Sequence, residues 1–317
     1  MGNLPGKIIV TAIGSDRPGI VAEISRVLYK HNANILKTRA SAVGNLFILV
    51  MLVDVSSADI SSDWIKEEVK EVGVKLGLGV SVEDAESFRR RKKLIAFDMD
   101  GTLVKGETIN ELAKAAGVYD KVRRVTEEAM EGRIDFKEAL TRRVKLLKGL
   151  PLSEIEKVKQ RLKIASGAED LVGELKKAGF VTAIITGGFD LFANHVAETL
   201  GIDYVYANRL KVKAGRLTGG FEGVILTPQD KLKALREISR REGIRLEECV
   251  AIGDGANDVI LLEGSGLGIG YKPKEAVKQR ADALVERLDL KTVLALIGVS
   301  QVSQDVAERL RAGARRG

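Results

Sequence analysis

Cysteine and histidine are scarce in this sequence of 317 residues. The single cysteine, Cys249, lies in an apolar run that predicts a buried strand, so we expect a core residue rather than a nucleophile. One cysteine allows no intrachain disulfide and is typical of a reducing compartment such as the cytoplasm. The two histidines, His31 and His195, belong to no polar cluster, which argues against a zinc site or a Ser–His–Asp triad.

Long apolar runs and aromatic residues are also few. No run approaches the roughly 18 apolar residues of a membrane span, and Pro5 and Gly6 interrupt the region where a signal peptide would be apolar. Aromatic residues make up 4% of the chain and do not alternate with its basic runs, so a stacking surface for single-stranded nucleic acid is not predicted. The net charge of +7 is concentrated in 89–93 and in the C-terminal tail. We therefore expect a cytoplasmic protein that binds neither membranes nor nucleic acids.

The first 86 residues predict a small α/β domain, because apolar runs of strand length alternate with segments of helical periodicity. We expect strands at 7–13, 34–42, 46–53 and 79–83, and helices at 20–32 and 61–76. The resulting order, βαββαβ, is that of the ferredoxin-like unit.

With its turn Asp16-Arg17-Pro18-Gly19-Ile20, this region resembles the ACT domain, a small regulatory module. The resemblance implies a site for an amino-acid effector at this turn, where the free amides of a helix start suit a carboxylate. On the alternative interpretation, the turn only starts the helix and the domain serves to dimerise the chain. We expect a homodimer.

Two carboxylates, Asp98 and Asp100, follow a buried strand predicted at 94–97. In open α/β sheets, ligands bind at the carboxyl ends of the strands. Neighbouring carboxylates repel each other, so they tend to hold a cation or to divide into an acid and a base. We expect this pair to lie at the centre of a domain over 94–298, joined to the first domain by a basic linker over 87–93.

The rest of this second domain predicts a helical insert followed by alternating strands and helices. The charged segment 108–151 has helical periodicity, and a helix over 153–162 has Ser153 and Glu156 at the spacing of a capping box. Beyond it we expect strands at 181–185, 204–207, 249–252 and 267–270, short antiparallel strands within 210–226, and helices at 168–178, 192–200, 229–242, 259–263 and 274–297. This order predicts a Rossmann-like parallel sheet. The basic tail, 299–317, receives no assignment.

Four polar clusters lie at predicted strand ends or just before helices. They are Asp98 with Asp100, Thr186-Gly187-Gly188, Lys231, and Asp254 with Asn257 and Asp258. Because the strand ends of a parallel sheet meet at one edge, the clusters should share a crevice. Carboxylates bind Mg²⁺, a hydroxyl and glycine amides hold phosphate oxygens, a lysine offsets their charge, and a carboxylate can attack phosphorus. The set predicts phosphoryl transfer.

Residues 93–297 resemble the haloacid-dehalogenase superfamily and, within it, the phosphoserine phosphatases. The motifs that carry the resemblance are Glu107, 128–132, Phe136, Arg142-Arg143, 186–189, 207–210 and 253–258. The helical insert, about 106–166, matches the cap that closes over the substrate in this family. The first region and this one together imply an ACT domain followed by a capped phosphatase domain.

The resemblance implies a role for each acidic residue. Asp98 would be the nucleophile that becomes phosphorylated, and Asp100 the general acid that then becomes the base. Asp98, the backbone carbonyl of Asp100 and Asp254 would hold Mg²⁺, and Asp258 would orient these ligands.

The resemblance also implies how substrate is held. Thr186, Gly187 and Asn257 would bind the phosphate, and Lys231 would pair with it. From the cap, Glu107 would bind the substrate ammonium and Arg143 its carboxylate, while Met130 and Phe136 would close the lid and exclude water. One departure is Gly101, where this family often has serine; another is Thr186, which replaces a frequent serine but keeps the hydroxyl.

The function implied is hydrolysis of O-phospho-L-serine to L-serine and phosphate, the last step of serine biosynthesis. The same site could instead pass the phosphoryl group to another alcohol such as homoserine, or serve another small phosphorylated metabolite. A non-catalytic amino-acid sensor is a more remote alternative, because every catalytic position holds a competent residue.

Overall fold

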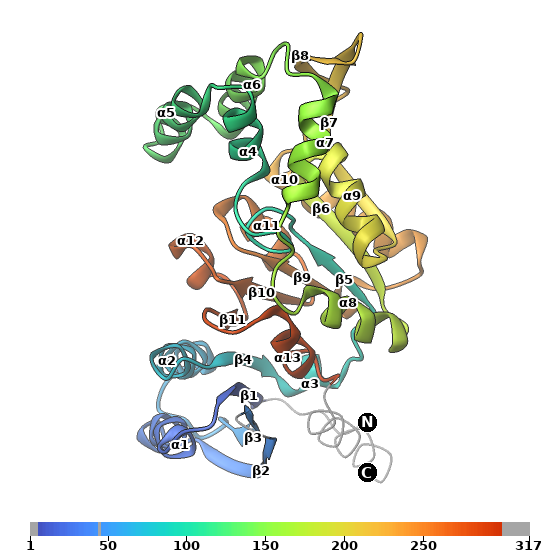
Figure 1. The fold of residues 1–317 in the computed structure, drawn as a ribbon. Coiled ribbons are helices and arrows are strands. Elements are labelled where there is room, and N and C mark those ends of the chain that lie inside the picture. Colours follow the sequence, from blue (N-terminus) through green and yellow to red (C-terminus); the bar gives the residue numbers. More distant parts are fainter. Residues whose placement is uncertain (1–5, 44–45, 300–317) are drawn as a thin grey trace.

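The computed structural model describes residues 6–43 and 46–299, so the basic tail lies almost entirely outside the described residues. Its strands form one mixed sheet of 11 strands in the order β2-β3-β1-β4-β11-β10-β9-β5-β6-β7-β8 (Figure 1). They are β1 Lys7–Ser15, β2 Asn34–Val43, β3 Leu46–Asp54, β4 Gly79–Asp84, β5 Leu94–Phe97, β6 Val181–Phe189, β7 Tyr204–Lys213, β8 Arg216–Glu222, β9 Cys249–Gly253, β10 Leu267–Tyr271 and β11 Ala283–Val285.

The helices lie on both faces of this sheet and in a separate cap. They are α1 Ile20–Lys30, α2 Ser62–Lys75, α3 Ala85–Arg89, α4 Thr108–Ala115, α5 Tyr119–Met130, α6 Phe136–Leu146, α7 Leu152–Arg161, α8 Ala168–Lys177, α9 Asp190–Leu200, α10 Pro228–Arg241, α11 Val259–Glu263, α12 Glu275–Lys278 and α13 Val293–Leu296, with 3₁₀ turns η1 Leu246–Glu248, η2 Ala256–Asp258 and η3 Leu290–Thr292. Within the described ranges, no helix is long and apolar enough to cross a membrane.

The N-terminal elements confirm the predicted βαββαβ order. β1 pairs antiparallel with β3 and β4, and β3 pairs with β2. Apolar side chains of α1 and α2, among them Ile24, Leu28 and Ile65, pack on one face of this part of the sheet. The spacing of the apolar residues in both helices thus buries a single stripe, as the sequence predicts.

β5 lies inside the parallel part of the sheet, between β6 and β9. Its side chains alternate: Ile95 and Phe97 join the core beneath α8 and α9, while Leu94 and Ala96 join the core beneath α10 and α11. Both faces are covered, which explains four apolar residues in succession. The strand therefore presents its carboxyl end, and whatever follows it, at the edge of a rigid sheet.

The prediction of continuous helix over 274–297 is wrong. The segment forms α12, β11, η3 and α13. β11 pairs parallel with β10 and antiparallel with β4, where Ala283 lies opposite Ser81 and Leu284 opposite Val80. A short apolar run buried on both faces has no alternation that separates strand from helix. The consequence is large, because β11 joins the sheets of the two predicted domains into one.

Two smaller predictions also need correction. The basic linker begins with helix α3, and Lys92 is buried, donating to the carbonyl oxygens of Gly266 at 3.0 Å and Glu247 at 3.3 Å. Helix α7 has Pro151 as its N-cap residue and no side-chain cap, so Ser153 does not form the predicted capping box.

The cap consists of α4 to α7 and lies at the upper end of the sheet in Figure 1, where Gly149 and Leu150 are hydrogen-bonded to Leu217 of β8. The chain enters the cap directly after the residues that follow β5 and leaves it just before α8. Any side chain near the start of α4 therefore lies between the sheet edge and the cap.

Candidate active site

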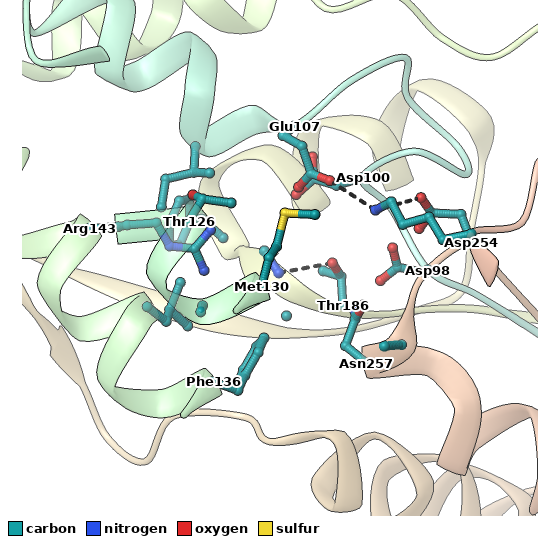
Figure 2. Close-up of a pocket in the computed structure, with 18 of the residues that line it drawn as sticks. Asp98, Asp100, Glu107, Thr126, Met130, Phe136, Arg143, Thr186, Asp254 and Asn257 are labelled. Atoms are coloured by element: carbon teal, nitrogen blue, oxygen red, sulfur yellow. Dashed lines mark hydrogen bonds and ion pairs between the residues drawn. The ribbon is translucent and has the colours of Figure 1, made fainter. Parts of the chain in front are cut away.

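A pocket of about 520 Å³ opens where the carboxyl ends of β5, β6 and β9 face the cap (Figure 2). Ten of the predicted site residues line it: Asp98, Asp100, Glu107, Met130, Phe136, Arg143, Thr186, Gly187, Asp254 and Asn257. The other two, Lys231 and Asp258, are buried behind its wall. The sequence prediction of a shared crevice is therefore confirmed, with contributions from both sheet and cap.

Three buried carboxylates lie together at this pocket: Asp98 and Asp254 line it, and Asp258 lies behind them. One oxygen each of Asp98, Asp254 and Asp258 lies within 4.8 Å of the others. The three residues are 3%, 7% and 0% exposed. Three buried carboxylates this close together repel one another. A hard divalent cation, which prefers oxygen ligands, relieves that repulsion. The donor set therefore fits Mg²⁺ or a similar ion.

Gly101 explains one departure from the family's pattern. Its φ of +77° is a conformation that favours glycine. A Cβ atom there would lie 2.6 Å from Asp254 Oδ2, closer than a side chain can approach a carboxylate oxygen. Glycine is thus needed for the turn that brings the loop after β5 against Asp254.

Lys231 holds two of the acids together from behind. Its Nζ lies 2.6 Å from Asp98 Oδ1 and 2.6 Å from Asp258 Oδ1. Burial lowers the pKa of the Lys231 ammonium, but the carboxylates of Asp258 and Asp98 outweigh burial and raise it above its ordinary value. The lysine is on α10, whose first turn has a capping box between Thr227 and Asp230.

The two carboxyl groups after β5 have different surroundings. Burial, and then repulsion from Asp258, raises the pKa of Asp98 well above its ordinary value, against the attraction of Lys231. Burial and the charge of Glu107 raise the pKa of Asp100 to about 7, although the backbone and hydroxyl of Thr108 donate to its two oxygens at 2.8 and 3.0 Å. A carboxyl group with this pKa can both give and accept a proton near neutral pH.

A buried amide is hydrogen-bonded to the carboxyl-terminal part of β6, where Thr186 and Gly187 lie. Asn208 donates to the carbonyl oxygen of Gly187 at 2.8 Å and accepts from the backbone of Leu226 at 2.7 Å. A Cβ on Gly187 would lie 3.2 Å from Phe136 of the cap, so glycine allows the cap side chain to approach this part of β6. The Thr186 hydroxyl accepts from the backbone of Gly188 at 2.9 Å, which leaves its own proton free to donate into the pocket.

The cap contributes charge and apolar surface. Arg143, on α6, is half-buried, and burial lowers its pKa against the charges of Glu107 and Asp100. Figure 2 shows Arg143, Met130 and Phe136 reaching toward the sheet-edge residues from α5 and α6. Met130 is 84% exposed and forms the rim. A ligand here would meet a cation and an anion on the cap side.

Sequence reasoning missed three residues of this site. Thr108 holds Asp100, Asn208 holds the carboxyl-terminal part of β6, and Lys274 lies 3.0 Å from Asp254 Oδ2 and 3.5 Å from Glu107 Oε1. Thr108 and Lys274 neither follow a predicted strand nor belong to an acidic cluster, whereas Asn208 directly follows the strand predicted at 204–207. Asn208 stood within the quoted motif at 207–210, which was the available signal for it.

A Rossmann-like sheet with acids after two adjacent strands, closed by a helical cap, defines a class of enzymes that transfer phosphoryl groups through an aspartate. Residues 95–263 match the haloacid dehalogenase-like hydrolases, and residues 7–83 match the ACT domain. The chain belongs to the haloacid dehalogenase-like hydrolases and, within them, to the phosphoserine phosphatase family. It is 43% identical over 282 residues to the phosphoserine phosphatase of Archaeoglobus fulgidus, covering 89% of this chain and 81% of that one.

Two solved structures agree with this assignment. A phosphoserine phosphatase with an analogue of the phospho-aspartyl intermediate is 47% identical, with a TM-score of 0.61 over 65% of this chain and 99% of that one. A hydrolase of the same superfamily from Salmonella enterica is 26% identical, with a TM-score of 0.81 over 92% of this chain and 98% of that one.

Proposed function

We propose that this enzyme hydrolyses O-phospho-L-serine to L-serine and phosphate, with Asp98 as the nucleophile. The observation that carries the proposal is the single pocket in which Asp98 and Thr186 face a cap bearing Glu107 and Arg143. Asp98 and Thr186 suit a phosphate. Glu107 and Arg143 suit an amino-acid head group. A phosphorylated amino acid carries both of these groups.

In the first half-reaction, a carboxylate oxygen of Asp98 attacks phosphorus and the bond from phosphorus to the seryl oxygen breaks. Asp100, as a carboxylic acid, donates its proton to the departing oxygen; its pKa of about 7 suits this role. Lys231, 2.6 Å from Asp98, favours the ionised form of the nucleophile and fixes its position. The products are L-serine and an aspartyl phosphate.

In the second half-reaction, Asp100 is a carboxylate and takes a proton from water. The water oxygen attacks phosphorus, the bond to Asp98 breaks, and phosphate leaves. Because Asp100 regains the proton that it gave, the enzyme returns to its starting state. The two hydrogen bonds from Thr108 fix the Asp100 carboxyl group for both transfers.

We propose Mg²⁺ as the cation of the buried acid cluster. Asp98, Asp254 and the backbone carbonyl of Asp100 would hold it, and Asp258 would orient the others through Lys231 and through backbone amides of the loop after β9. When bound, Mg²⁺ would offset the charge on the phosphoryl oxygens and allow the Asp98 carboxylate to approach them.

Substrate would bind between sheet and cap. Thr186, Gly187 and Asn257 would donate to the phosphate, and Glu107 and Arg143 would bind the ammonium and carboxylate of the serine part. Lys231, buried 2.6 Å from Asp98, would support the nucleophile and offset the charge of the bound phosphate. Met130 and Phe136, at the rim, would then exclude water from the intermediate.

The test is phosphate release from a panel of phosphate esters with Mg²⁺ and with EDTA. We expect O-phospho-L-serine to be hydrolysed much faster than its deamino analogue, 3-(phosphonooxy)propanoate, and EDTA to abolish both reactions. The Arg143→Ala variant should lose activity on phosphoserine. Full activity of Arg143→Ala on some other ester that wild type prefers would contradict the substrate assignment.

A phosphotransferase is distinguished in the same assay. Wild-type enzyme is incubated with phosphoserine and excess homoserine, and phosphohomoserine is measured beside free phosphate. We expect free phosphate to account for nearly all phosphoserine consumed. If phosphohomoserine is the main product, the enzyme is a phosphotransferase rather than a hydrolase.

We further propose that residues 1–86 act as a regulatory and dimerisation domain with an amino-acid effector at the turn Asp16–Ile20. Support for a dimer comes from apolar side chains left exposed on this domain, namely Val21, Tyr29, Leu36, Leu46 and Trp64. The cytoplasm is the compartment that we propose, because the one cysteine is buried and unpaired.

A further inference from the structure

Lys274 connects the sheet side of the pocket to the cap, and the mechanism above leaves it unused. Its Nζ lies 3.0 Å from Asp254 Oδ2 and 3.5 Å from Glu107 Oε1, the ion pairs drawn as dashed lines in Figure 2. Its backbone N–H also donates to the carbonyl oxygen of Asp254 at 2.8 Å. The lysine precedes α12, so the sheet-side elements fix its position at both ends.

Glu107 needs such a partner because its neighbours repel it. Asp100 and Asp254, whose carboxylates line the same pocket, repel its negative charge. Its side chain is 44% exposed and makes no capping hydrogen bond at the start of α4. Arg143 also lines the pocket, on the cap side, so without Lys274 the Glu107 carboxylate would turn toward the cap or out to solvent, away from Asp254.

We infer that Lys274 is a positioning residue for substrate specificity: it holds Glu107 in the orientation that binds the substrate's ammonium group. The inference rests on the proposed function. Lys274 takes one oxygen of Glu107, Oε1, and a carboxylate has a second oxygen with free lone pairs for the ligand. Likewise Lys274 takes Oδ2 of Asp254 and leaves Oδ1 for the cation.

Lys278, at the end of α12, offers a matched control. It pairs with Glu286 at 3.1 Å and with Glu275 at 3.7 Å, and it does not line the pocket. Replacing either lysine by methionine removes one positive charge from this segment. Only Lys274→Met removes the contacts with Glu107 and Asp254.

The experiment compares Lys274→Met, Lys274→Arg and Lys278→Met on O-phospho-L-serine and on 3-(phosphonooxy)propanoate, which lacks the amino group. For Lys274→Met we expect KM for phosphoserine to rise about fivefold relative to KM for the analogue, the size of one partly exposed ion pair. The contact of Lys274 with Asp254 is common to both substrates, so discrimination, the ratio of the two kcat/KM values, falls by the same factor and reports the contact with Glu107. Lys274→Arg should restore most of it, and Lys278→Met should match wild type.

A binding measurement checks the result without turnover. In the Asp98→Asn background, the dissociation constant for phosphoserine, measured by calorimetry, should rise by the same factor when Lys274→Met is added. Unchanged discrimination in Lys274→Met, with or without an equal loss of kcat on both substrates, would overturn the inference alone. A wild-type enzyme inactive on phosphoserine would overturn the proposed function and this inference together.

Discussion

Lys231 is the residue on which the acid cluster depends. It is 1% exposed and bridges Asp98 and Asp258, each at 2.6 Å. Buried carboxylates in contact with a buried ammonium form a network in which removal of the cation leaves charge without compensation. Both the stability of the fold and the position of the nucleophile therefore depend on the Lys231 side chain.

The Lys231→Met variant tests this dependence. In EDTA, where no divalent ion can substitute for the ammonium, we expect the free energy of unfolding to fall by roughly 3–5 kcal/mol. Urea unfolding followed by circular dichroism measures the loss. Added Mg²⁺ should restore part of the stability but not the activity, because the nucleophile is no longer held. A variant as stable as wild type in EDTA would contradict the account of the cluster.

The sequence predicted the residues with proposed chemical roles better than the residues that position them. Asp98, Thr186 and Asp254 follow buried strands, and that position is visible in the sequence. Thr108 and Lys274 act by touching a residue from another segment, which no local pattern reveals. The contacts of Lys231 with Asp98 and Asp258 follow from the packing of α10, which no local pattern reveals.

Among the elements, β4 and β11 form the junction between the two halves of the sheet, and a buried acid lies in it. Glu83, on β4, is 6% exposed. Lys92 approaches its Oε2 to 3.6 Å, an ion pair that is too long for a hydrogen bond. Burial raises the pKa of Glu83 to about 7, with Lys92 opposing and Asp282 adding to the shift.

This raised pKa predicts how stability depends on pH. Between the ordinary value of 4.5 and about 7, folded Glu83 holds a proton that the unfolded chain has released. Its contribution to the free energy of unfolding is therefore complete below pH 4.5 and declines, by up to about 3 kcal/mol, as pH rises to 7. Urea unfolding across this pH range measures the free energy of unfolding. That of wild type should decline by up to about 3 kcal/mol more than that of Glu83→Gln.

A nearby acid provides the control. Asp84 has an exposed side chain that pairs with Lys66 at 3.2 Å, so Asp84→Asn should keep the wild-type slope. If Glu83→Gln and wild type change in parallel between pH 4.5 and 7, the buried carboxyl group does not hold its proton in the folded state.

The elements themselves were largely predictable, with a physical reason for each failure. Long amphipathic helices such as α1 and α2 bury one stripe of side chains, so their periodicity is clear. β11 has three residues, all buried, and its short apolar run carries no strand alternation. Its pairing with β4 depends on contact between segments about 200 residues apart, which a local reading of the chain does not contain.

The whole molecule is organised by one sheet that runs from the ACT domain to the pocket. β4 pairs with β11, β11 with β10, and β10 with β9, whose carboxyl end carries Asp254. Ile13 of β1 belongs to the same apolar core as Ile95 and Phe97 of β5. The ACT domain is thus packed into the catalytic part rather than tethered to it.

Removing residues 1–89 tests how much this shared sheet contributes to stability and to activity. β11 would become an exposed edge, and apolar surface beneath β1 would meet water. We expect the melting temperature to fall by roughly 5 °C or more. We expect kcat/KM for phosphoserine to stay within a few fold, because no residue of 1–89 lines the pocket and the cap lies far from the ACT domain (Figure 1). The solved phosphoserine phosphatase that aligns over 99% of its length with 65% of this chain supports the second expectation.

For the shortened chain, differential scanning fluorimetry measures the melting temperature and steady-state kinetics measure kcat/KM for phosphoserine. An unchanged melting temperature would mean that the β4–β11 junction contributes little. A shortened chain that is folded but inactive would mean that the ACT domain completes the site.

The central claim is that Asp98 carries the phosphoryl group, and one comparison tests it most directly: phosphate release from O-phospho-L-serine in Mg²⁺ by wild type and by Asp98→Asn. The substitution keeps the size of the side chain and removes the nucleophilic carboxylate. The account predicts rapid release by wild type and a rate lower by about 1,000-fold or more for Asp98→Asn. Activity of Asp98→Asn close to that of wild type would contradict it.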